Sequence, residues 1–303
     1  QGLLGEIVHV EGGYLHSLDK FWPLFDDNWR LKFNQAHDGD VYATHGLGPI
    51  CFALNIHRGD RMTHLVAMDS NSWIGSELSK ESLGTEEFAN GDQTSTLIKT
   101  EQGQTILLQH NVYTPRPYNR LYQLTGTKGF ANKYPTEGYA VDAKQLAATG
   151  HQPKVDNLSS HGFMPDAEKQ ALAAQYQHHV LKKYGAMAKE VGGHGGMDFI
   201  MDARMVYCLQ NGLPLDMDVY DLAEWCSLAE LGALSMDNNC ASVAFPDFTR
   251  GNWNKVKGYK HAYAPEAEEK AVEEAAKAFT AAQKEATAKL NLWSLYDAVK
   301  QAK

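Results

Sequence analysis

The amino-acid sequence predicts an α+β fold, in which a mainly antiparallel open sheet carries helices on one face and a helical tail follows at the C-terminus. Three observations predict it. Strand-like runs separated by glycine-containing turns occur between residues 6 and 125, helical periodicity begins at residue 166, and an Ala/Glu/Lys-rich segment occupies residues 266–289. We expect one domain over residues 1–253 and a tail over residues 254–303.

Alternating apolar and polar residues predict the strands of the sheet. The runs are residues 6–11, 62–68, 94–100, 105–113 and 119–125. A short turn around Gly103 joins the third run to the fourth, so we expect an antiparallel meander. Helical stretches around residues 19–26 and 49–55 interrupt the meander, which places helices on one face of the sheet.

The second half of the chain is predicted to be helical. A helical pattern covers residues 166–190 after Pro165, and two more helices are expected over residues 198–211 and 215–228. The Ala-rich residues 266–289 read as a solvent-facing helix with a weak apolar stripe. The aromatic residues 292–296 that follow it are expected to dock on the body of the protein.

Composition limits the classes of partner. The chain of 303 residues is 43% hydrophobic and 21% charged, which is typical of a globular protein. A net charge of −9 and the lack of a Lys/Arg block disfavour nucleic acid and anionic membranes. No apolar run approaches the roughly 18 residues of a membrane span. The four cysteines show neither CxxC spacing nor a disulfide framework, so we expect buried free thiols.

The most informative stretch is residues 39–49, in which Tyr42 and His45 precede Gly46, Gly48 and Pro49. If a helix begins near residue 44, the phenol and the imidazole lie at its positive end, a setting that favours anionic forms and suits proton transfer. The two glycines would let a ligand approach the backbone. The alternative is an ordinary helix start capped by a threonine side chain.

A second glycine cluster, residues 192–196, surrounds His194. His194 and Asp198 are spaced to share one helix face and to meet one ligand, although a tight loop with a capping histidine is an equal alternative. Neither glycine cluster fits a dinucleotide fingerprint, because the first lacks the third glycine and the second follows a helix rather than a strand. The Walker, nucleophile-elbow and zincin signatures are missing from the sequence.

Five motifs, taken in order, carry a resemblance to a known family. Residues 5–16, 42–49, 193–199, 211–216 and 246–251 closely resemble glycoside hydrolase family 109. That family comprises NAD-dependent α-N-acetylgalactosaminidases built on the Gfo/Idh/MocA oxidoreductase fold. The resemblance covers residues 2–253.

The resemblance also implies what this chain lacks. The family carries an N-terminal Rossmann domain ahead of the strand at residues 5–7, and that domain is absent from this sequence. We therefore expect the C-terminal, substrate-binding half of such an enzyme, with NAD held by the missing domain. A periplasmic or secreted bacterial location is implied by the resemblance alone.

The resemblance implies a glycosidase that works by oxidation and elimination. The sugar C3 hydroxyl is oxidised by hydride transfer to NAD⁺, the C2 proton becomes acidic beside the ketone, the aglycone leaves, water adds and the hydride returns. His45 matches the catalytic histidine and is our candidate base for the C3 hydroxyl. Tyr42 and Tyr14 are candidates for the C2 proton and the leaving group, in an order that the sequence leaves open.

Four further residues are expected to bind the substrate, a glycan or glycoside with terminal N-acetylgalactosamine. Arg30 matches a substrate-contact position of the family, and Arg30 or His16 would lower the pKa of a tyrosine as a nearby cation or donor. His194 and Asp198 are placed near the sugar by the resemblance. Members of this fold pair through the open sheet face, so we also expect a homo-oligomer that buries strands such as residues 105–113.

Three alternatives stay open. A plain Gfo/Idh/MocA sugar oxidoreductase would keep His45 and lose the elimination steps. A metal-dependent hydrolase would gather zinc or manganese ligands, namely His16, His45, His194 and Asp198. The third alternative is that this half serves only as an oligomerisation sheet.

Overall fold

The computed structural model describes residues 2–19, 21, 22 and 26–258. By their internal contacts these residues form two compact units. The first, here called the sheet unit, comprises Gln1–Gln175 and Val219–Gly258; the second, the helical unit, comprises the described residues Tyr176–Asp218. The predicted helix at residues 266–289 and the aromatic docking segment at residues 292–296 lie outside the described residues, so the tail and the boundary at residue 253 stay predictions.

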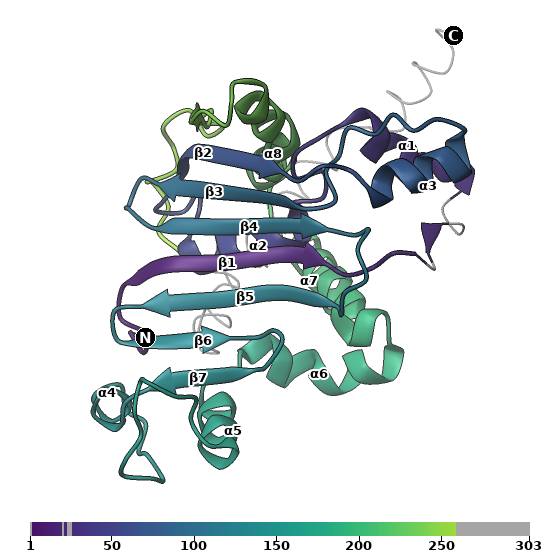
Figure 1. The fold of residues 1–303 in the computed structure, drawn as a ribbon. Coiled ribbons are helices and arrows are strands. Elements are labelled where there is room, and N and C mark those ends of the chain that lie inside the picture. Colours follow the sequence, from purple (N-terminus) through teal and green to yellow (C-terminus); the bar gives the residue numbers. More distant parts are fainter. Residues whose placement is uncertain (1, 20, 23–25, 259–303) are drawn as a thin grey trace, which may run out of the picture. The chain divides into compact units, whose positions relative to one another are not determined.

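An eight-stranded sheet dominates the sheet unit (Figure 1), with the strand order β7-β6-β5-β1-β4-β3-β2-β8. The strands are β1 (Ile7–Leu15), β2 (Met62–Asp69), β3 (Thr94–Thr100), β4 (Thr105–Asn111), β5 (Asn119–Gly126), β6 (Gly129–Asn132), β7 (Gly138–Val141) and β8 (Val243–Ala244). All neighbouring strands are antiparallel except β1 and β4, which are parallel. The predicted mainly antiparallel open sheet is confirmed. The simple meander is wrong, because β1 lies between β4 and β5.

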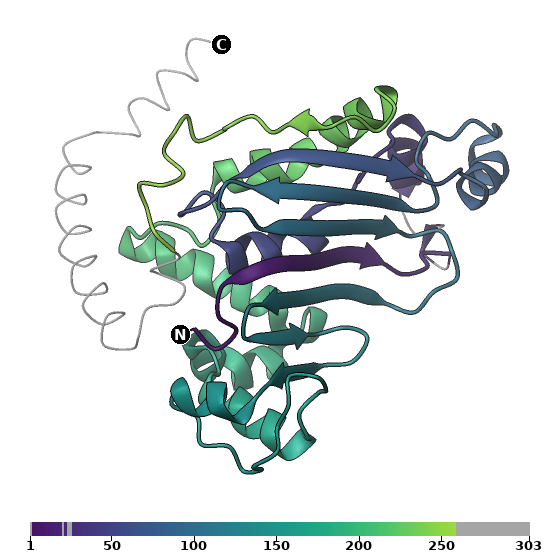
Figure 2. The ribbon, with the colours of Figure 1, turned by 60° about the vertical axis from the view of Figure 1, so that its left-hand side comes forward.

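Two helices of the sheet unit cover one face of the sheet. In Figure 1 and Figure 2, α2 (Thr44–Leu54) lies behind β1 and α8 (Val219–Asp237) lies behind β2, whereas no described helix of this unit lies over the opposite face. Helices on one face are therefore confirmed. The other elements of the unit are η2 (Asp26–Asn28), α1 (Trp29–Ala36), α3 (Ile74–Leu83), α4 (Ala143–Ala148) and α5 (Asp166–Gln175).

The core lies between the sheet and these two helices. Alternate residues of β1, β4 and β3 point toward the helices and are buried, including Val10, Ile106 and Ile98. They pack with Leu47 of α2 and Leu228 of α8. Burying each such side chain contributes about 1.5–3 kcal/mol. A second buried cluster, at the C-terminal end of β1, includes Tyr14 and Leu31 of α1.

The helical unit contains α6 (His179–Val191), the 3₁₀ turn η3 (His194–Gly196) and α7 (Met197–Asn211). The helix predicted over residues 198–211 is confirmed, and it ends at Gly212 in the left-handed conformation. The single helix predicted over residues 166–190 is wrong. It is two helices, α5 and α6, because His178 is extended and its Nδ1 accepts a hydrogen bond from the Val180 amide as an N-cap.

Other expectations need smaller corrections. The helix expected at residues 215–228 is α8, which begins at Val219 and continues to Asp237. The four cysteines are free, as expected, and Cys51 and Cys208 are buried. Cys226 is exposed and Cys240 is half-buried, contrary to expectation. No helix among the described residues has the length and apolar character needed to cross a membrane.

Candidate active site

The candidate site lies where the first turn of α2 meets the end of β1. As predicted, α2 begins at Thr44, which places His45 in the first turn and Tyr42 just before it. Thr44 is not the cap, which corrects the expected alternative. The N-cap is Ala43, in helical conformation, and no side chain caps this end of the helix. The positive end of the helix dipole therefore lies at the residues that form the site, Tyr42 and His45.

The glycines of this stretch serve packing rather than ligand approach. A Cβ on Gly46 would lie 2.7 Å from the Gly13 nitrogen, and a Cβ on Gly12 would lie 2.4 Å from the Gly46 carbonyl oxygen. A Cβ on Gly48 would contact the ring of Trp225 at 3.5 Å. The expected open approach for a ligand is thus wrong, since protein atoms occupy the space beside both Gly46 and Gly48. The close contact brings His45 down onto β1.

Tyr14, Tyr42 and His45 form a triangle of rings. The ring centroids of Tyr14 and Tyr42 are 4.8 Å apart, those of Tyr14 and His45 are 4.7 Å apart, and those of Tyr42 and His45 are also 4.7 Å apart. Each ring therefore touches the other two, although the three residues come from a strand, a loop and a helix. Two phenols and one imidazole are thus gathered in one place, a set of groups able to exchange protons with one bound molecule.

Arg30 of α1 supplies the positive charge of this site. Its Cζ lies 4.4 Å from the ring centroid of Tyr42 and 5.6 Å from that of Tyr14, and the residue is only 8% exposed. A guanidinium over aromatic faces is attracted by their quadrupoles. A buried cation in this position also favours any negative charge that forms on either phenol.

His16 lies at the outer side of Tyr14, with ring centroids 4.7 Å apart in an edge-on arrangement. Burial lowers the pKa of His16, and the charges of Arg30 and Arg120 lower it further. The imidazole is therefore neutral near pH 7. Of the two roles expected for His16, a cation or a hydrogen-bond donor beside a tyrosine, a neutral ring leaves that of donor, which stays a prediction.

The sequence reasoning missed Tyr122, which completes the site from β5. Its hydroxyl donates a hydrogen bond to the His45 carbonyl oxygen. Leu121 and Tyr122 have φ of 60° and 54°, at an irregularity in the pairing of β5 with β1. Such a bulge turns a side chain away from the regular strand direction. Two tyrosines four residues apart, Tyr118 and Tyr122, were the available signal, but residues 119–125 were interpreted only as a strand.

His110 of β4 was also missed. It is the register neighbour of Tyr14 across the parallel pair β1–β4, and it has no exposed surface. The His110 and Tyr14 rings are nearly parallel, with centroids 6.3 Å apart and an interplanar angle of 23°. A histidine within an apolar strand pattern gave no local sign that it would lie beneath the site.

His194 and Asp198 belong to the helical unit. The expected shared helix face is wrong, because His194 lies in η3 before α7 begins at Met197; the two side chains instead contact each other, with His194 Nδ1 2.9 Å from Asp198 Oδ2. Gly193 makes room for this pair, because a Cβ there would lie 2.9 Å from Asp198 Oδ2. The proximity of His194 and Asp198 to the sugar stays a prediction.

The described residues do not offer an evident cofactor or metal cradle. Protein atoms fill the space beside Gly46 and Gly48, and residues 192–196 connect α6 to α7 rather than a strand to a helix. The described part of the chain therefore does not fit a dinucleotide. Across residues 2–19, 21, 22 and 26–258, no group of three or more His, Cys, Asp or Glu is placed to hold a metal ion. The metal-dependent hydrolase gains no support from this arrangement.

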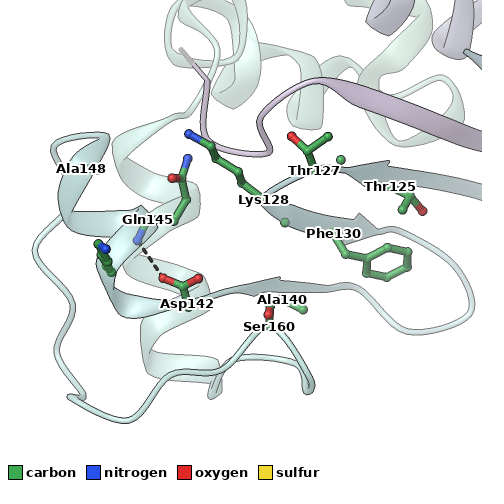
Figure 3. Close-up of a pocket in the computed structure, with 12 residues that line it drawn as sticks. Thr125, Thr127, Lys128, Phe130, Ala140, Asp142, Gln145, Ala148 and Ser160 are labelled. Atoms are coloured by element: carbon green, nitrogen blue, oxygen red, sulfur yellow. Dashed lines mark hydrogen bonds between the residues drawn. The ribbon is translucent and has the colours of Figure 1, made fainter. Parts of the chain in front are cut away.

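A separate hollow of about 600 Å³ lies beside the β5–β6 turn and α4 (Figure 3). Lys128 and Gln145 line it, and the Asp142 carboxylate beside them accepts a hydrogen bond from the backbone amide of Gln145. Gly126, also in its wall, pairs with Ile7, at the opposite end of β1 from Tyr14. The hollow is therefore not part of the ring cluster.

Comparisons with known proteins agree on one family. Residues 1–255 match the family described as Glycosyl hydrolase 109, C-terminal domain. The chain is 66% identical over 298 residues to Glycosyl hydrolase family 109 protein 5 of Phocaeicola vulgatus. The aligned region covers 95% of this chain and 57% of that protein. It is 57% identical over 266 residues to Glycosyl hydrolase family 109 protein 1 of Bacteroides thetaiotaomicron. Here the aligned region covers 87% of this chain and 57% of that protein. The chain thus spans little more than half the length of these relatives.

The fold is similar to that of a solved oxidoreductase. One match is a structure of levoglucosan dehydrogenase in complex with NADH and levoglucosan. The alignment covers 82% of this chain and 60% of the dehydrogenase chain, with a TM-score of 0.51 and 14% sequence identity. At that identity the likeness concerns the fold alone. It confirms the expected fold of the Gfo/Idh/MocA C-terminal domain.

Proposed function

This chain belongs to glycosyl hydrolase family 109, as its C-terminal domain, and from that premise we propose that it forms the sugar-binding part of an enzyme that removes terminal α-N-acetylgalactosamine. The enzyme is a glycosidase by family. The proposal adds the sugar and the route, which are oxidation, elimination, addition and reduction.

The triangle of Tyr14, Tyr42 and His45 carries the proposal. Most glycosidases use two carboxyl groups on either side of the scissile bond. The groups gathered here are instead two phenols, an imidazole and the Arg30 guanidinium. Such a set suits a route in which protons move at several atoms of one sugar and no glycosyl-enzyme ester forms.

Each residue then has a role at a stated atom. His45 takes the proton of the C3 hydroxyl, because an imidazole titrates near neutral pH. One of Tyr14 and Tyr42 takes the C2 proton, and the other protonates the leaving oxygen. Arg30 favours the phenolate that forms on either ring. The neutral His16 hydrogen-bonds the sugar, and His194 and Asp198 are proposed as further sugar contacts.

NAD is part of the proposal for the whole enzyme. NAD supplies the hydride acceptor and donor at C3 when it is bound. Because the described residues of this chain do not fit a dinucleotide, we propose that NAD is held by residues outside them. The share of this chain in the reaction is then the binding of the sugar and the movement of its protons.

The test uses a hybrid enzyme in which this chain replaces the matching 57% of the P. vulgatus relative. The hybrid is incubated in D₂O with an aryl α-N-acetylgalactosaminide and catalytic NAD⁺, and the released sugar is analysed by NMR; the intact relative is the control. Cleavage with deuterium at C2 supports the proposed route. Cleavage without deuterium, in a hybrid that matches the relative in rate, contradicts it.

The same test separates the second candidate, a sugar oxidoreductase. The likeness in fold to levoglucosan dehydrogenase favours this candidate. An oxidoreductase forms NADH in proportion to the sugar consumed and releases no aglycone. The glycosidase releases the aglycone with NAD unchanged overall.

We also propose that two copies of the chain associate through the open sheet face. Leu97 of β3 and Met68 of β2 are 50% and 56% exposed there, and Leu97 is the register neighbour of Leu107 on one side and Val66 on the other. An apolar row on a face that no described helix of the sheet unit covers favours self-association.

A further inference from the structure

His110 occupies a position where an apolar side chain is expected. Along β4, Ile106 and Leu108 point toward α2 and are fully buried in the core. His110 follows two residues later and therefore points to the same side of the sheet. It also has no exposed surface. The strand thus continues its buried row with an imidazole.

The two nitrogens of this imidazole have no hydrogen-bond partner in the described part of the chain. Within the residues that the structure describes, neither Nδ1 nor Nε2 of His110 meets a donor or an acceptor. The neighbouring Thr94, which is in register with His110 on β3, directs its hydroxyl to the Gly39 carbonyl oxygen instead. Buried polar groups in native proteins nearly always have a partner, and an internal water or a bound ligand is an explanation of an exception.

The surroundings determine the chemistry of that partner. Burial, together with the electrostatic effects of Arg30 and His16, lowers the pKa of His110 to about 3. The ring is therefore neutral, with one N–H that donates and one nitrogen that accepts. It has no charge to pair with an anion. A hydroxyl group, which both donates and accepts, matches it.

The position of His110 connects this group to the site. His110 is the register neighbour of Tyr14 on the adjacent strand, and their rings are nearly parallel at 6.3 Å. Arg30, which lies over Tyr14, acts electrostatically on both residues. A hydroxyl group held by His110 therefore lies at the inner end of the Tyr14, Tyr42 and His45 triangle.

We propose that His110 binds a hydroxyl group at the floor of this triangle, supplied by an internal water or by the sugar, and thereby positions the reacting groups around Tyr14. The proposal rests on the proposed function only in taking the triangle as the sugar site. If the hydroxyl belongs to a water, His110 is a positioning residue that acts through Tyr14. If it belongs to the sugar, His110 determines which sugar hydroxyl is oriented inward.

The first test is NMR of the chain with ¹⁵N-labelled histidine, before and after N-acetylgalactosamine is added. The expected result is a neutral His110 ring from pH 5 to 8 with both nitrogens hydrogen-bonded. A shift of these signals on addition of the sugar identifies the sugar as the source of the hydroxyl. Contact with water and no shift identifies an internal water. Ring nitrogens with the signature of free imidazole overturn the proposal.

The second test compares His110→Met with His110→Gln in the hybrid enzyme. Because the methionine removes an imidazole whose nitrogens meet no group among the described residues, we expect the melting temperature of this variant to equal or exceed that of the wild type. Its cleavage rate falls by roughly tenfold or more, and glutamine, which can donate and accept, restores part of it. A rise in the KM of the methionine variant indicates that the sugar supplies the hydroxyl group. A fall in its kcat alone indicates that an internal water supplies it. A matched variant, His64→Met, replaces an exposed histidine of β2 and leaves the rate unchanged.

Two outcomes separate the failure of this proposal from the failure of the proposed function. A wild-type hybrid that does not cleave the galactosaminide, together with hydrogen-bonded His110 nitrogens, contradicts the proposed function and supports the role of His110. A hybrid that cleaves equally fast with methionine, glutamine or histidine at position 110 contradicts the role of His110. If both variants fail to fold, the NMR of the wild type decides.

Discussion

Gly46 and Gly13 hold α2 against β1 at backbone distance: a Cβ on Gly46 would lie 2.7 Å from the Gly13 nitrogen and 2.9 Å from the Gly13 Cα. Atoms of a backbone cannot move aside as the end of a flexible side chain can. The spacing between α2 and β1 therefore depends on the missing side chain. The same spacing fixes the position of His45 above Tyr14.

We expect Gly46→Ala to destabilise the fold by about 1–3 kcal/mol, because the overpacked methyl group must push α2 away from β1. Chemical denaturation measures the change. The matched control is Gly48→Ala in the same helix, whose Cβ would make an ordinary contact with Trp225 at 3.5 Å. There the gain in helix propensity, up to about 1 kcal/mol, opposes any loss. Equal stability of the two variants would contradict this account of Gly46.

Local sequence patterns predicted the parts of the fold that depend on neighbouring residues. The start of α2 at Thr44 and the β3–β4 hairpin around Gly103 are examples. The position of β1 between β4 and β5 was not predictable in this way, because it pairs residues about a hundred positions apart. The helix α3 was missed for a related reason. Its first amide groups are satisfied by the Asp92 carboxylate, far along the chain, and not by a local cap.

In the candidate site too, some residues were predicted from the sequence and others were missed because distant parts of the chain bring them there. The resemblance and the residue types pointed to Tyr14, Tyr42, His45, His16 and Arg30, and the structure places these five together. Their catalytic roles stay predictions. Tyr122 and His110 were missed because the backbone bulge and the strand register that bring them to the site are properties of the folded sheet.

The hydroxyl groups of Tyr14 and Tyr42 are expected to be needed for cleavage. Tyr14→Phe and Tyr42→Phe keep the ring contacts and remove the oxygen, so we expect a loss of activity of about 10²-fold or more in the hybrid, with an unchanged melting temperature. Deuterium exchange at C2 identifies the C2 base as the tyrosine whose loss abolishes it. Tyr139→Phe, on β7 at the far side of the sheet, is the matched control. Full activity in both site variants would exclude phenolic catalysis.

Asp40 is expected to make stability fall between about pH 4 and pH 7. Burial raises the pKa of its carboxyl to about 7, although the Tyr42 amide donates a hydrogen bond to it. The folded state therefore binds this proton more tightly than the unfolded state, and the resulting stability is lost as the pH rises through 7. We expect Asp40→Asn to be more stable than the wild type at pH 8, by about 1–3 kcal/mol. Its stability should no longer fall as the pH rises from about 4 to about 7. Asp156→Asn, at an exposed position, should leave the fall of stability with pH unchanged.

His57 is expected to affect stability in a higher pH window. Its imidazole lies between Glu224 and Asp221, and Arg58 donates two hydrogen bonds of 2.8 Å to Asp221. Burial opposes the charged ring, but hydrogen bonds and charges from the two carboxylates outweigh it and raise the pKa of His57 to about 9.

Because the pKa of His57 is higher in the folded state than its ordinary value near 6.5, its contribution is complete below about pH 6.5 and is lost as the pH rises through 9. We expect His57→Gln to be about 1–3 kcal/mol less stable than the wild type at pH 6, with a smaller difference at pH 9.5. Thermal unfolding at both pH values measures this. His64→Gln, an exposed histidine on β2, is the control. A difference that is the same at both pH values would show that the ring contributes by packing alone.

The open sheet face makes the proposed association of two copies testable at one residue. Leu97 lies midway along β3 on this face, between Leu107 and Val66, and is 50% exposed. A lysine there would place a charge inside an apolar interface, where it costs several kcal/mol unless it is paired. We therefore expect Leu97→Lys to turn a dimer into a monomer at micromolar concentration, as measured by light scattering after size exclusion. Leu234→Lys, which is on α8 and 48% exposed, adds the same charge away from this face and should leave the dimer intact. If the wild type is itself a monomer, or if both variants dissociate alike, the open face is not the interface.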